Sequence, residues 1–166
     1  MMIRPATPAD VPLVIPMVSA LAKLHEAWDP QRFDYKPGVA EMYDHWLRQR
    51  ANDPRSVFLV AEREPGKLAG FVIATIEGTI PVYRLKETGF IHDMWVDPQY
   101  RNEGIGRQLT MLTIEKFREM GIRQVRLETA AANETARALF TSCGFRVSSV
   151  EMLVEVAEPR ESHRMP

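Results

Sequence analysis

An apolar segment that leads through a glycine-containing loop into an amphipathic helix constrains this fold most. Residues 89–96 are mostly apolar and stop at Asp97-Pro98, whereas apolar residues in 104–120 recur at helical spacing. Gly104 and Gly106 lie where the loop meets the helix. The pattern predicts a strand, a tight loop and a helix packed on a sheet. The expected inward stripe of the helix is Ile105, Leu109, Leu112, Thr113 and Met120.

The rest of the chain predicts further strands and helices around this unit. The Pro65-Gly66 turn joins two apolar runs into a hairpin. The order predicts an α/β (α+β layered) fold, with a mixed central sheet, antiparallel N-terminal strands and about four flanking helices. The expected elements are a strand at 2–6, helices at 7–27 and 39–50, strands at 56–61, 68–77 and 89–96, a helix at 104–120, a strand at 124–129, a helix at 133–143, and a last strand pair or bent strand at 145–156.

Length and composition predict one domain without disulfides. A chain of 166 residues can bury a core of its own, so we expect a single domain at 1–157 and a loose polar tail at 158–166. The single cysteine excludes an intramolecular disulfide and is compatible with the cytoplasm. The net charge of -1 gives no electrostatic footprint for nucleic acid or an anionic membrane. No uncharged apolar stretch approaches the roughly 18 residues of a membrane helix.

The glycine loop has the chemistry of an anion site. Gly104 and Gly106 let the backbone approach a ligand, and the unpaired N–H groups at a helix start favour negative charge. Arg101 and Arg107 flank these glycines and could add charged hydrogen bonds. A pyrophosphate site is one interpretation. The other is a tight turn with solvated arginines, and the two glycines alone do not decide between them.

A nicotinamide-dinucleotide fingerprint fits less well. Glu128 lies near the end of the next expected strand, as that fingerprint requires, but Leu109 occupies the place of its third glycine. The preceding strands look antiparallel instead of forming repeated βαβ units, and no Walker A lysine pattern is present. These differences argue against both nucleotide motifs.

Two motifs resemble those of the GNAT (Gcn5-related N-acetyltransferase) family. The strand, Asp-Pro and R-x-x-G-x-G at 101–106 resemble its acyl-CoA loop, and N-x-x-A-x-x-L-F-x-x-x-G-F at 133–145 resembles the helix and strand that close its cofactor groove. The resemblance is specific over 89–147 and only architectural over the N-terminal half. It implies the GNAT fold and an acetyl-CoA co-substrate, with no metal.

The resemblance also assigns roles to residues of the groove. Backbone groups of 94–96 would pair with the pantetheine arm, and residues 102–107 would hold the pyrophosphate. Asn133 has a second role as helix N-cap, and the two roles are compatible. The implied cofactor-binding residues are Met94, Trp95, Val96, Arg101, Asn102, Glu103, Gly104, Ile105, Gly106, Arg107, Asn133 and Phe140.

Two residues are candidates for the base that deprotonates an amine. An alkyl ammonium has a pKa of about 10.4, so acyl transfer to it needs a base or a water relay. The resemblance implies a catalytic glutamate at the position of Glu128, and a glutamate or histidine that activates the amine at the position of His92. The structural alternatives are an ordinary strand-end carboxylate for Glu128 and a packed histidine for His92. In a regular strand Asp93 would point to the face opposite His92, so we do not expect a His-Asp pair.

Phe140 departs from the family pattern. Many GNAT enzymes that resemble this chain carry a tyrosine here, thought to protonate the leaving CoA thiolate, and phenylalanine has no proton to give. A thiol pKa near 8.5 makes the thiolate a tolerable leaving group. Ser142, Cys143 or water could substitute, although Cys143 also fits a packed apolar position.

The resulting functional hypothesis is an N-acetyltransferase that moves an acetyl group from acetyl-CoA to a primary amine of a small molecule or peptide by direct attack. The alternative is an acyl-CoA-binding sensor, or degenerate GNAT domain, without turnover. We expect no nucleic-acid or membrane partner. Similarity to proteins of this type also makes residues 146–156 a candidate homodimer contact.

Overall fold

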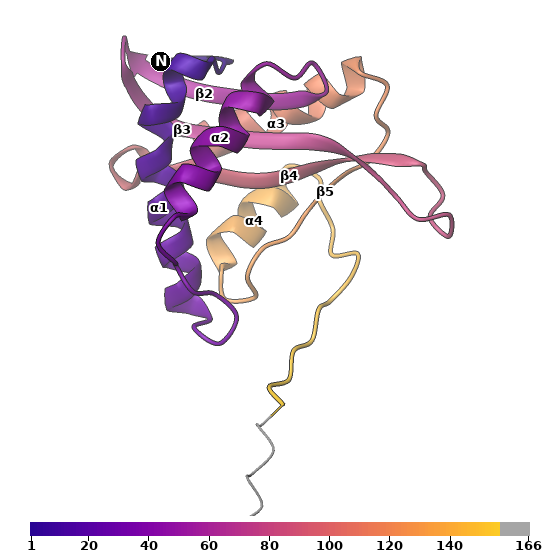
Figure 1. The fold of residues 1–166 in the computed structure, drawn as a ribbon. Coiled ribbons are helices and arrows are strands. Elements are labelled where there is room, and N and C mark those ends of the chain that lie inside the picture. Colours follow the sequence, from indigo (N-terminus) through magenta and orange to yellow (C-terminus); the bar gives the residue numbers. More distant parts are fainter. Residues whose placement is uncertain (157–166) are drawn as a thin grey trace, which may run out of the picture.

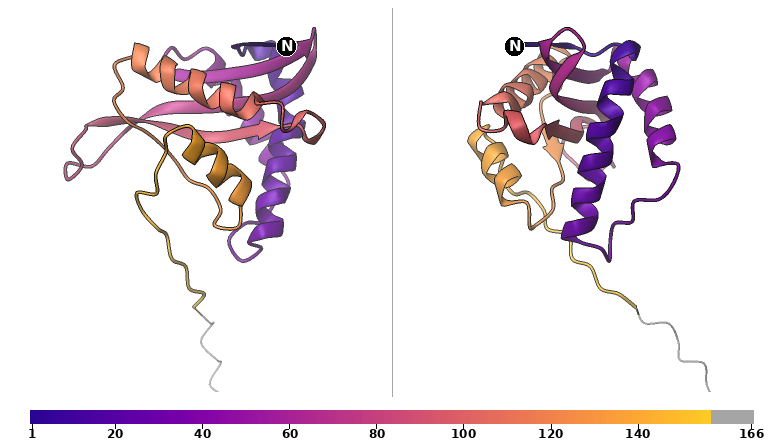
Figure 2. Two further views of the ribbon diagram at one scale, coloured as in Figure 1. Left: turned by 180° about the vertical axis from the view of Figure 1, so that it is seen from behind. Right: turned by 90° about the vertical axis from the view of Figure 1, so that its left-hand side faces the viewer.

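The computed structural model describes residues 1–156 and places one five-stranded sheet between two layers of helices (Figure 1). The views in Figure 2 show α1 and α2 on one face and α3 and α4 on the other. Short 3-10 turns at 8–10 and 98–100 complete the fold. The elements are β1 (Met2–Pro5), α1 (Val11–Trp28), α2 (Val39–Ala51), β2 (Ser56–Glu64), β3 (Lys67–Gly78), β4 (Glu87–Val96), α3 (Ile105–Glu119), β5 (Val125–Leu127) and α4 (Glu134–Ser142).

The sheet is mixed, as the sequence predicts. Its strand order is β1-β2-β3-β4-β5, and the first four strands pair antiparallel with their neighbours. β5 runs parallel to β4 because α3 provides the crossover between them. This last pairing is short, since it joins only Gly89–Ile91 to Val125–Leu127. β4 therefore continues for five residues beyond its last β5 partner.

Two apolar clusters hold the helices to the sheet. Val60, Phe71 and Ile73 pack with α1 and α2, whereas Val72 and Ala74 pack with α3, as expected for strands that are buried on both faces. The predicted stripe of α3 is partly wrong. Leu112 and Met120 are exposed, and Phe117 is fully buried instead. The true stripe follows the four-residue spacing 105, 109, 113 and 117.

A β-bulge interrupts the pairing of β4 with β3. Ile73 pairs with Asp93 and Ala74 pairs with Ile91, so His92 is the extra residue of β4. His92 contacts Trp46 of α2, and Asp93 contacts Tyr43 of the same helix. Both side chains therefore face α2. The prediction that they point to opposite faces is wrong because it assumed an uninterrupted strand.

The expected last strand is also absent from the described chain. Gly144 ends α4 with a φ of 95°, Phe145 packs on Phe140, and residues 146–156 then extend away from the body without pairing (Figures 1 and 2). Their alternation is typical of a strand, but no strand of the described chain pairs with them. The tail predicted at 158–166 lies outside the described residues, as does position 157 at the predicted domain boundary.

Gly89 is required by close packing against α3. A Cβ at this position would lie 2.6 Å from Cδ2 of the fully buried Phe117. We expect Gly89→Ala to lower the free energy of unfolding by about 1–3 kcal/mol, because the ring cannot move away in a filled core. Gly78→Ala in β3 is the control, since its Cβ would meet nothing within 4 Å. Equal urea midpoints for the two variants would contradict this packing.

Candidate functional site

The candidate site lies where β4 separates from β5. Beyond Ile91, β4 has no strand partner on that side among residues 1–156, so the backbone groups of its last five residues that point away from β3 form no ladder hydrogen bonds there. Arg101 folds back over this stretch: its Nε donates to the Val96 carbonyl oxygen at 3.0 Å and its guanidinium lies 4.8 Å from the Trp95 ring centroid. The stretch predicted to pair with pantetheine, Met94 to Val96, thus forms the open edge.

The start of α3 lies directly beyond this edge. Gly104 is the N-cap residue, with a φ of 80°, and Asn102, two positions earlier, also has a positive φ of 67°. No side chain caps this helix, and its first turn holds no acidic residue. The first N–H groups of α3 are therefore available to a negatively charged ligand. This geometry favours the anion-site interpretation over a simple tight turn.

Two cations from the β2–β3 hairpin join the loop, and sequence reasoning missed them. Arg63 and Lys67 lie over the Tyr100 ring, at 4.7 Å and 5.9 Å from its centroid. Arg63 also forms an ion pair with Glu103. The hairpin was predictable, but its position beside the loop depends on the β3–β4 pairing. The loop is therefore more basic than Arg101 and Arg107 alone indicate.

Gly106 and Arg107 contact α4 in this structure. A Cβ on Gly106 would lie 3.0 Å from Cδ2 of Leu139, so this glycine permits close helix packing. The Arg107 guanidinium donates to the Ser142 carbonyl oxygen at 2.6 Å. Ile105 is buried in the core. Binding of phosphate by these three residues remains a prediction. Their backbone N–H groups are better candidates for it than the Arg107 side chain, because that side chain already bonds Ser142.

The second motif forms α4, as predicted. The Asn133 Oδ1 accepts a hydrogen bond from the Ala136 N–H at 3.1 Å, which confirms its role as N-cap. Phe140 is buried and meets Phe145 edge-on, with centroids 5.6 Å apart. Cys143 is a free, half-buried thiol at the end of the helix. A role of Asn133 or Phe140 in cofactor binding stays a prediction.

His92 lies in a mixed aromatic and polar environment on the α2 side of the sheet. Its Nε2 is 2.7 Å from the Thr75 hydroxyl and 3.6 Å from a Glu77 carboxylate oxygen. The rings of Trp46 and Phe90 stand edge-on to it, at 5.2 Å and 4.8 Å. Burial lowers the pKa of His92 below its ordinary value of 6.5, and nearby Glu77 only partly opposes this. The imidazole is therefore neutral at pH 7 and able to accept a proton.

Glu77 and Glu128 have different surroundings. Glu77 forms an ion pair with Arg126 of β5, whose guanidinium lies 4.4 Å from the Phe90 centroid. Glu128 is exposed and makes no hydrogen bond or ion pair with another described residue. It follows Arg126 by two positions, so alternation would place it on the His92 side of the sheet. The structure shows no contact between the two predicted bases.

Asp93 and Tyr43 form a pair that sequence reasoning missed. The Tyr43 hydroxyl lies near the Asp93 carboxyl and favours its ionised form, and no described cation forms an ion pair with it. Burial raises the pKa of Asp93 to about 6, although the neighbouring Tyr43 hydroxyl opposes the rise. Burial also raises the pKa of Tyr43. No sequence signal predicts the bulge that turns Asp93 toward α2.

The raised pKa of the half-buried Asp93 predicts a pH-dependent stability. Its pKa is about 6 in the folded chain and near 3.8 when exposed, so its favourable contribution is present below pH 4 and lost as pH rises through 6. We expect Asp93→Asn to raise the free energy of unfolding above pH 6 by about 3 kcal/mol and to have little effect near pH 4. Urea titrations at several pH values measure this difference.

Asp44→Asn is a control whose effect on stability should depend on pH in the opposite direction. A hydrogen bond from Arg48 holds the pKa of the exposed Asp44 below its ordinary value, so its contribution is present at neutral pH and lost as pH falls. Asp44→Asn should therefore destabilise at pH 7, and this effect should shrink in acid. A pH-independent effect of Asp93→Asn would show that its carboxyl is not buried as described.

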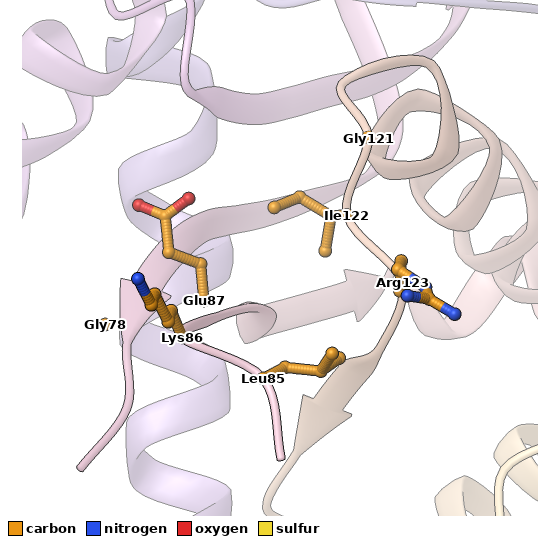
Figure 3. A pocket seen from close by; sticks show the side chains of 7 residues that line it. All are labelled: Gly78, Leu85, Lys86, Glu87, Gly121, Ile122 and Arg123. Atoms are coloured by element: carbon orange, nitrogen blue, oxygen red, sulfur yellow. The ribbon is translucent and has the colours of Figure 1, made fainter. Parts of the chain in front are cut away.

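One hollow in the described chain lies away from these residues. It sits beside the link between β3 and β4, where the chain before β5 approaches (Figure 3). No predicted site residue lines it. Its lining residues are Gly78, Leu85, Lys86, Glu87, Gly121, Ile122 and Arg123.

Two further classes of site find no support among residues 1–156. No three histidine, cysteine, aspartate or glutamate side chains in this range come together in a way that could hold a metal ion. No helix in the same range combines the length and apolar character needed to span a bilayer.

Comparison with known proteins agrees with this arrangement. The sequence model of the Acetyltransferase (GNAT) family matches residues 21–145, which include the open edge of β4, the loop and α4. The chain belongs to the GNAT acetyltransferase family. The predicted resemblance is thus confirmed, and it extends into the N-terminal half as well.

Relatives within the family differ in what their names say they acetylate. A mycothiol acetyltransferase from Cellulomonas flavigena is 31% identical over 137 residues, which are 77% of this chain and 39% of the relative. The [ribosomal protein bS18]-alanine N-acetyltransferase of Escherichia coli is 29% identical over 51% of this chain and 52% of its own length. This GNAT chain thus spans about two fifths to one half of the length of these relatives.

Solved structures confirm the GNAT fold. A mutant BH1408 protein from Bacillus halodurans superposes with a TM-score of 0.84 at 22% identity, over 95% of this chain and 100% of that one. A predicted acetyltransferase from Clostridium acetobutylicum, solved with acetyl-CoA, gives a TM-score of 0.74 at 16% identity, over 93% and 95% of the two chains. At these identities the likeness concerns the fold alone.

Proposed function

We propose that this GNAT acetyltransferase transfers the acetyl group of acetyl-CoA directly to a primary amine of a small molecule or peptide. The observation that carries the proposal is the position of a neutral imidazole, His92, at the bulge just before the open edge of β4. A donor bound along that edge would have its reactive end next to a group that accepts protons. Direct attack then needs no covalent enzyme intermediate.

The residues present fit acetyl-CoA. Backbone groups of Met94 to Val96 that point away from β3 offer ladder hydrogen bonds to the amides of pantetheine, as a strand would; Arg101 would have to leave the Val96 carbonyl oxygen to free that acceptor. The uncapped start of α3 offers N–H groups to the pyrophosphate, and Arg63 and Lys67 add positive charge nearby. Acetyl-CoA would supply an activated acyl group. The chain would supply its orientation.

His92 is the proposed general base. Thr75 holds Nε2 through a short hydrogen bond, and the flanking Trp46 and Phe90 rings limit the movement of the imidazole. A proton taken from the ammonium or from the attacking amine would leave an imidazolium close to the Glu77 carboxylate, which would stabilise it. Glu128 is the alternative base, acting alone or through water from its exposed position.

The departing thiolate has no evident acid in α4. Phe140 carries no proton, and the Ser142 hydroxyl already donates to the Leu139 carbonyl oxygen at 2.7 Å. Cys143 is half-buried beside Arg107. We therefore propose departure as the thiolate, or protonation by water, because a thiol pKa near 8.5 makes this leaving group acceptable at neutral pH.

The acceptor is proposed to be of one of the two kinds that the relatives' names give. One name refers to mycothiol and the other to an alanine of a ribosomal protein, so a small molecule and a polypeptide both occur among relatives. Tyr83, in the link between β3 and β4, is exposed and could contact an acceptor, whereas Glu87 is already paired with Arg55. The alternative function, a sensor that binds acyl-CoA without turnover, is motivated by Phe140.

Release of free CoA thiol across a panel of amines and peptides tests the proposed function. We expect acetyl-CoA-dependent thiol release with at least one acceptor, together with the acetylated product by mass spectrometry. Tight acetyl-CoA binding without turnover on any acceptor would favour the sensor, and absence of binding would contradict both functions.

A further inference from the structure

The Arg126 side chain reaches from β5 across β4 to β3. Arg126 is the register partner of Phe90 in β4, and its guanidinium lies 4.4 Å from the centroid of that ring. Its Nε donates to the Thr88 hydroxyl at 3.3 Å, and a terminal nitrogen forms an ion pair with Glu77 of β3. Three contacts therefore fix where the charge of this arginine lies.

Glu77 presents its two carboxylate oxygens to two different groups. Oε2 is bound by Arg126, whereas Oε1 lies 3.6 Å from Nε2 of His92. A carboxylate within about 4–6 Å of an imidazole favours its protonated form. The Glu77 and His92 side chains are 33% and 25% exposed, so solvent screens this attraction only in part. The basicity of His92 therefore depends on how much of the Glu77 charge Arg126 neutralises.

The charges around the imidazole come from three elements. Burial lowers the pKa of His92 most, Glu77 on β3 raises it, and Arg126 on β5 and Arg50 on α2 lower it. Asp93, the next residue of β4, also faces α2, and α1 covers this side of the sheet with apolar side chains. Of the two arginines, only Arg126 also binds the Glu77 carboxylate. Its loss would remove one positive charge and release one negative charge together.

We propose that Arg126 is a positioning residue for acetyl transfer, which holds the Glu77 carboxylate so that the His92 imidazole stays neutral and ready to accept the proton of the amine. The inference rests on the proposed function, because only a base needs this protonation state. Without Arg126, the Glu77 charge would act on His92 alone. An imidazolium would then form at higher pH, and it has no lone pair for the proton of an acceptor.

NMR titration of the His92 imidazole tests the proposal without any need for turnover. The Cε1–H signal is assigned by its absence in His92→Ala. Its titration midpoint should rise by about one pH unit in Arg126→Gln and should fall in Glu77→Gln. Arg126→Gln combined with Glu77→Gln should return the midpoint close to that of the wild type, because both charges are then removed together.

Three further variants control for structural effects. Arg126→Lys keeps the positive charge and should keep the midpoint near that of the wild type. Arg126→Met keeps an apolar stem on the Phe90 ring and should raise the midpoint, so it serves if Arg126→Gln does not fold. Arg123→Gln makes the same change of net charge at an exposed residue beside the hollow of Figure 3, and it should leave the midpoint unchanged.

The outcomes separate this proposal from the proposed function. An unchanged midpoint in folded Arg126→Gln or Arg126→Met overturns the role of Arg126, and so does an equal rise in Arg123→Gln. A raised midpoint in a chain that acetylates no acceptor supports the control of His92 by Arg126 and contradicts the proposed transfer. With an active chain, the acid limb of kcat/KM should move by the same amount in Arg126→Gln, which is a loss of about tenfold on that limb. A limb that stays in place overturns the positioning role.

Discussion

Replacement of His92 by alanine is expected to lower kcat/KM for acetyl transfer by about 10²- to 10⁴-fold, the range for removal of a general base. The imidazole is neutral at pH 7 because burial lowers its pKa, and the Thr75 hydroxyl orients it. KM for acetyl-CoA should stay close to that of the wild type, because the residues proposed to bind the donor lie beyond His92. Steady-state kinetics with the best acceptor of the panel measure both parameters.

His45→Ala is the matched control for this substitution. His45 is an exposed histidine on α2 whose ring bonds Gln49, and its removal should leave kcat/KM unchanged. The wild-type pH profile should show an acid limb below 6.5 that is lost in His92→Ala, since the pKa of His92 is lowered. An unchanged rate in His92→Ala together with a large loss in Glu128→Ala would reassign the base to Glu128.

Placing a carboxylate at Gly104 is expected to weaken donor binding strongly. Gly104→Glu should raise the Kd for acetyl-CoA by at least about 100-fold, that is about 2.7 kcal/mol. Two effects act together: the side chain brings negative charge to the N–H groups proposed to bind pyrophosphate, and it occupies the space that the glycine leaves open. Isothermal titration of acetyl-CoA measures the change.

Gly38→Glu separates binding from backbone strain. Gly38 is the N-cap of α2, with a φ of 89°, and a Cβ added to it would meet nothing within 4 Å, so it matches Gly104 in conformation, in helix position and in free space. Both variants should lose about 1–2 kcal/mol of stability, because a non-glycine residue is strained in the left-handed region. Only Gly104→Glu should lose affinity. Equal affinities in the two variants would place the pyrophosphate elsewhere.

Much of the fold was predictable because its signals are local. The Pro65-Gly66 turn, the apolar run into Asp97-Pro98 and the Asn133 cap each specify an element from neighbouring residues alone. The two motifs of the loop and α4 were enough to indicate the family. Predicted boundaries differ from the observed ones by a few residues, as at β5, which is shorter than expected because only three residues find partners on β4.

What sequence reasoning missed depends on contacts between distant segments. The bulge at His92 arises from the β3–β4 register, and it alone brings Asp93 to Tyr43. The contact of Arg63 with the Tyr100 ring likewise depends on how the β2–β3 hairpin packs beside the loop. A last strand pair or bent strand was predicted at 145–156, but a strand needs a neighbour, and the described chain supplies none for residues 146–156. Periodicity reports which face is apolar, whereas it does not report what covers that face.

Titration of acetyl-CoA into the wild-type protein tests the central claim most directly, because the proposed chemistry begins with a donor held between the open edge of β4 and the start of α3. We predict one saturable site per chain, with a Kd in the micromolar range and weaker binding of dephosphorylated pantetheine fragments that lack the pyrophosphate. Absence of saturable binding at millimolar acetyl-CoA, by a chain whose circular dichroism shows it to be folded, would contradict the proposed donor site and the transfer that depends on it.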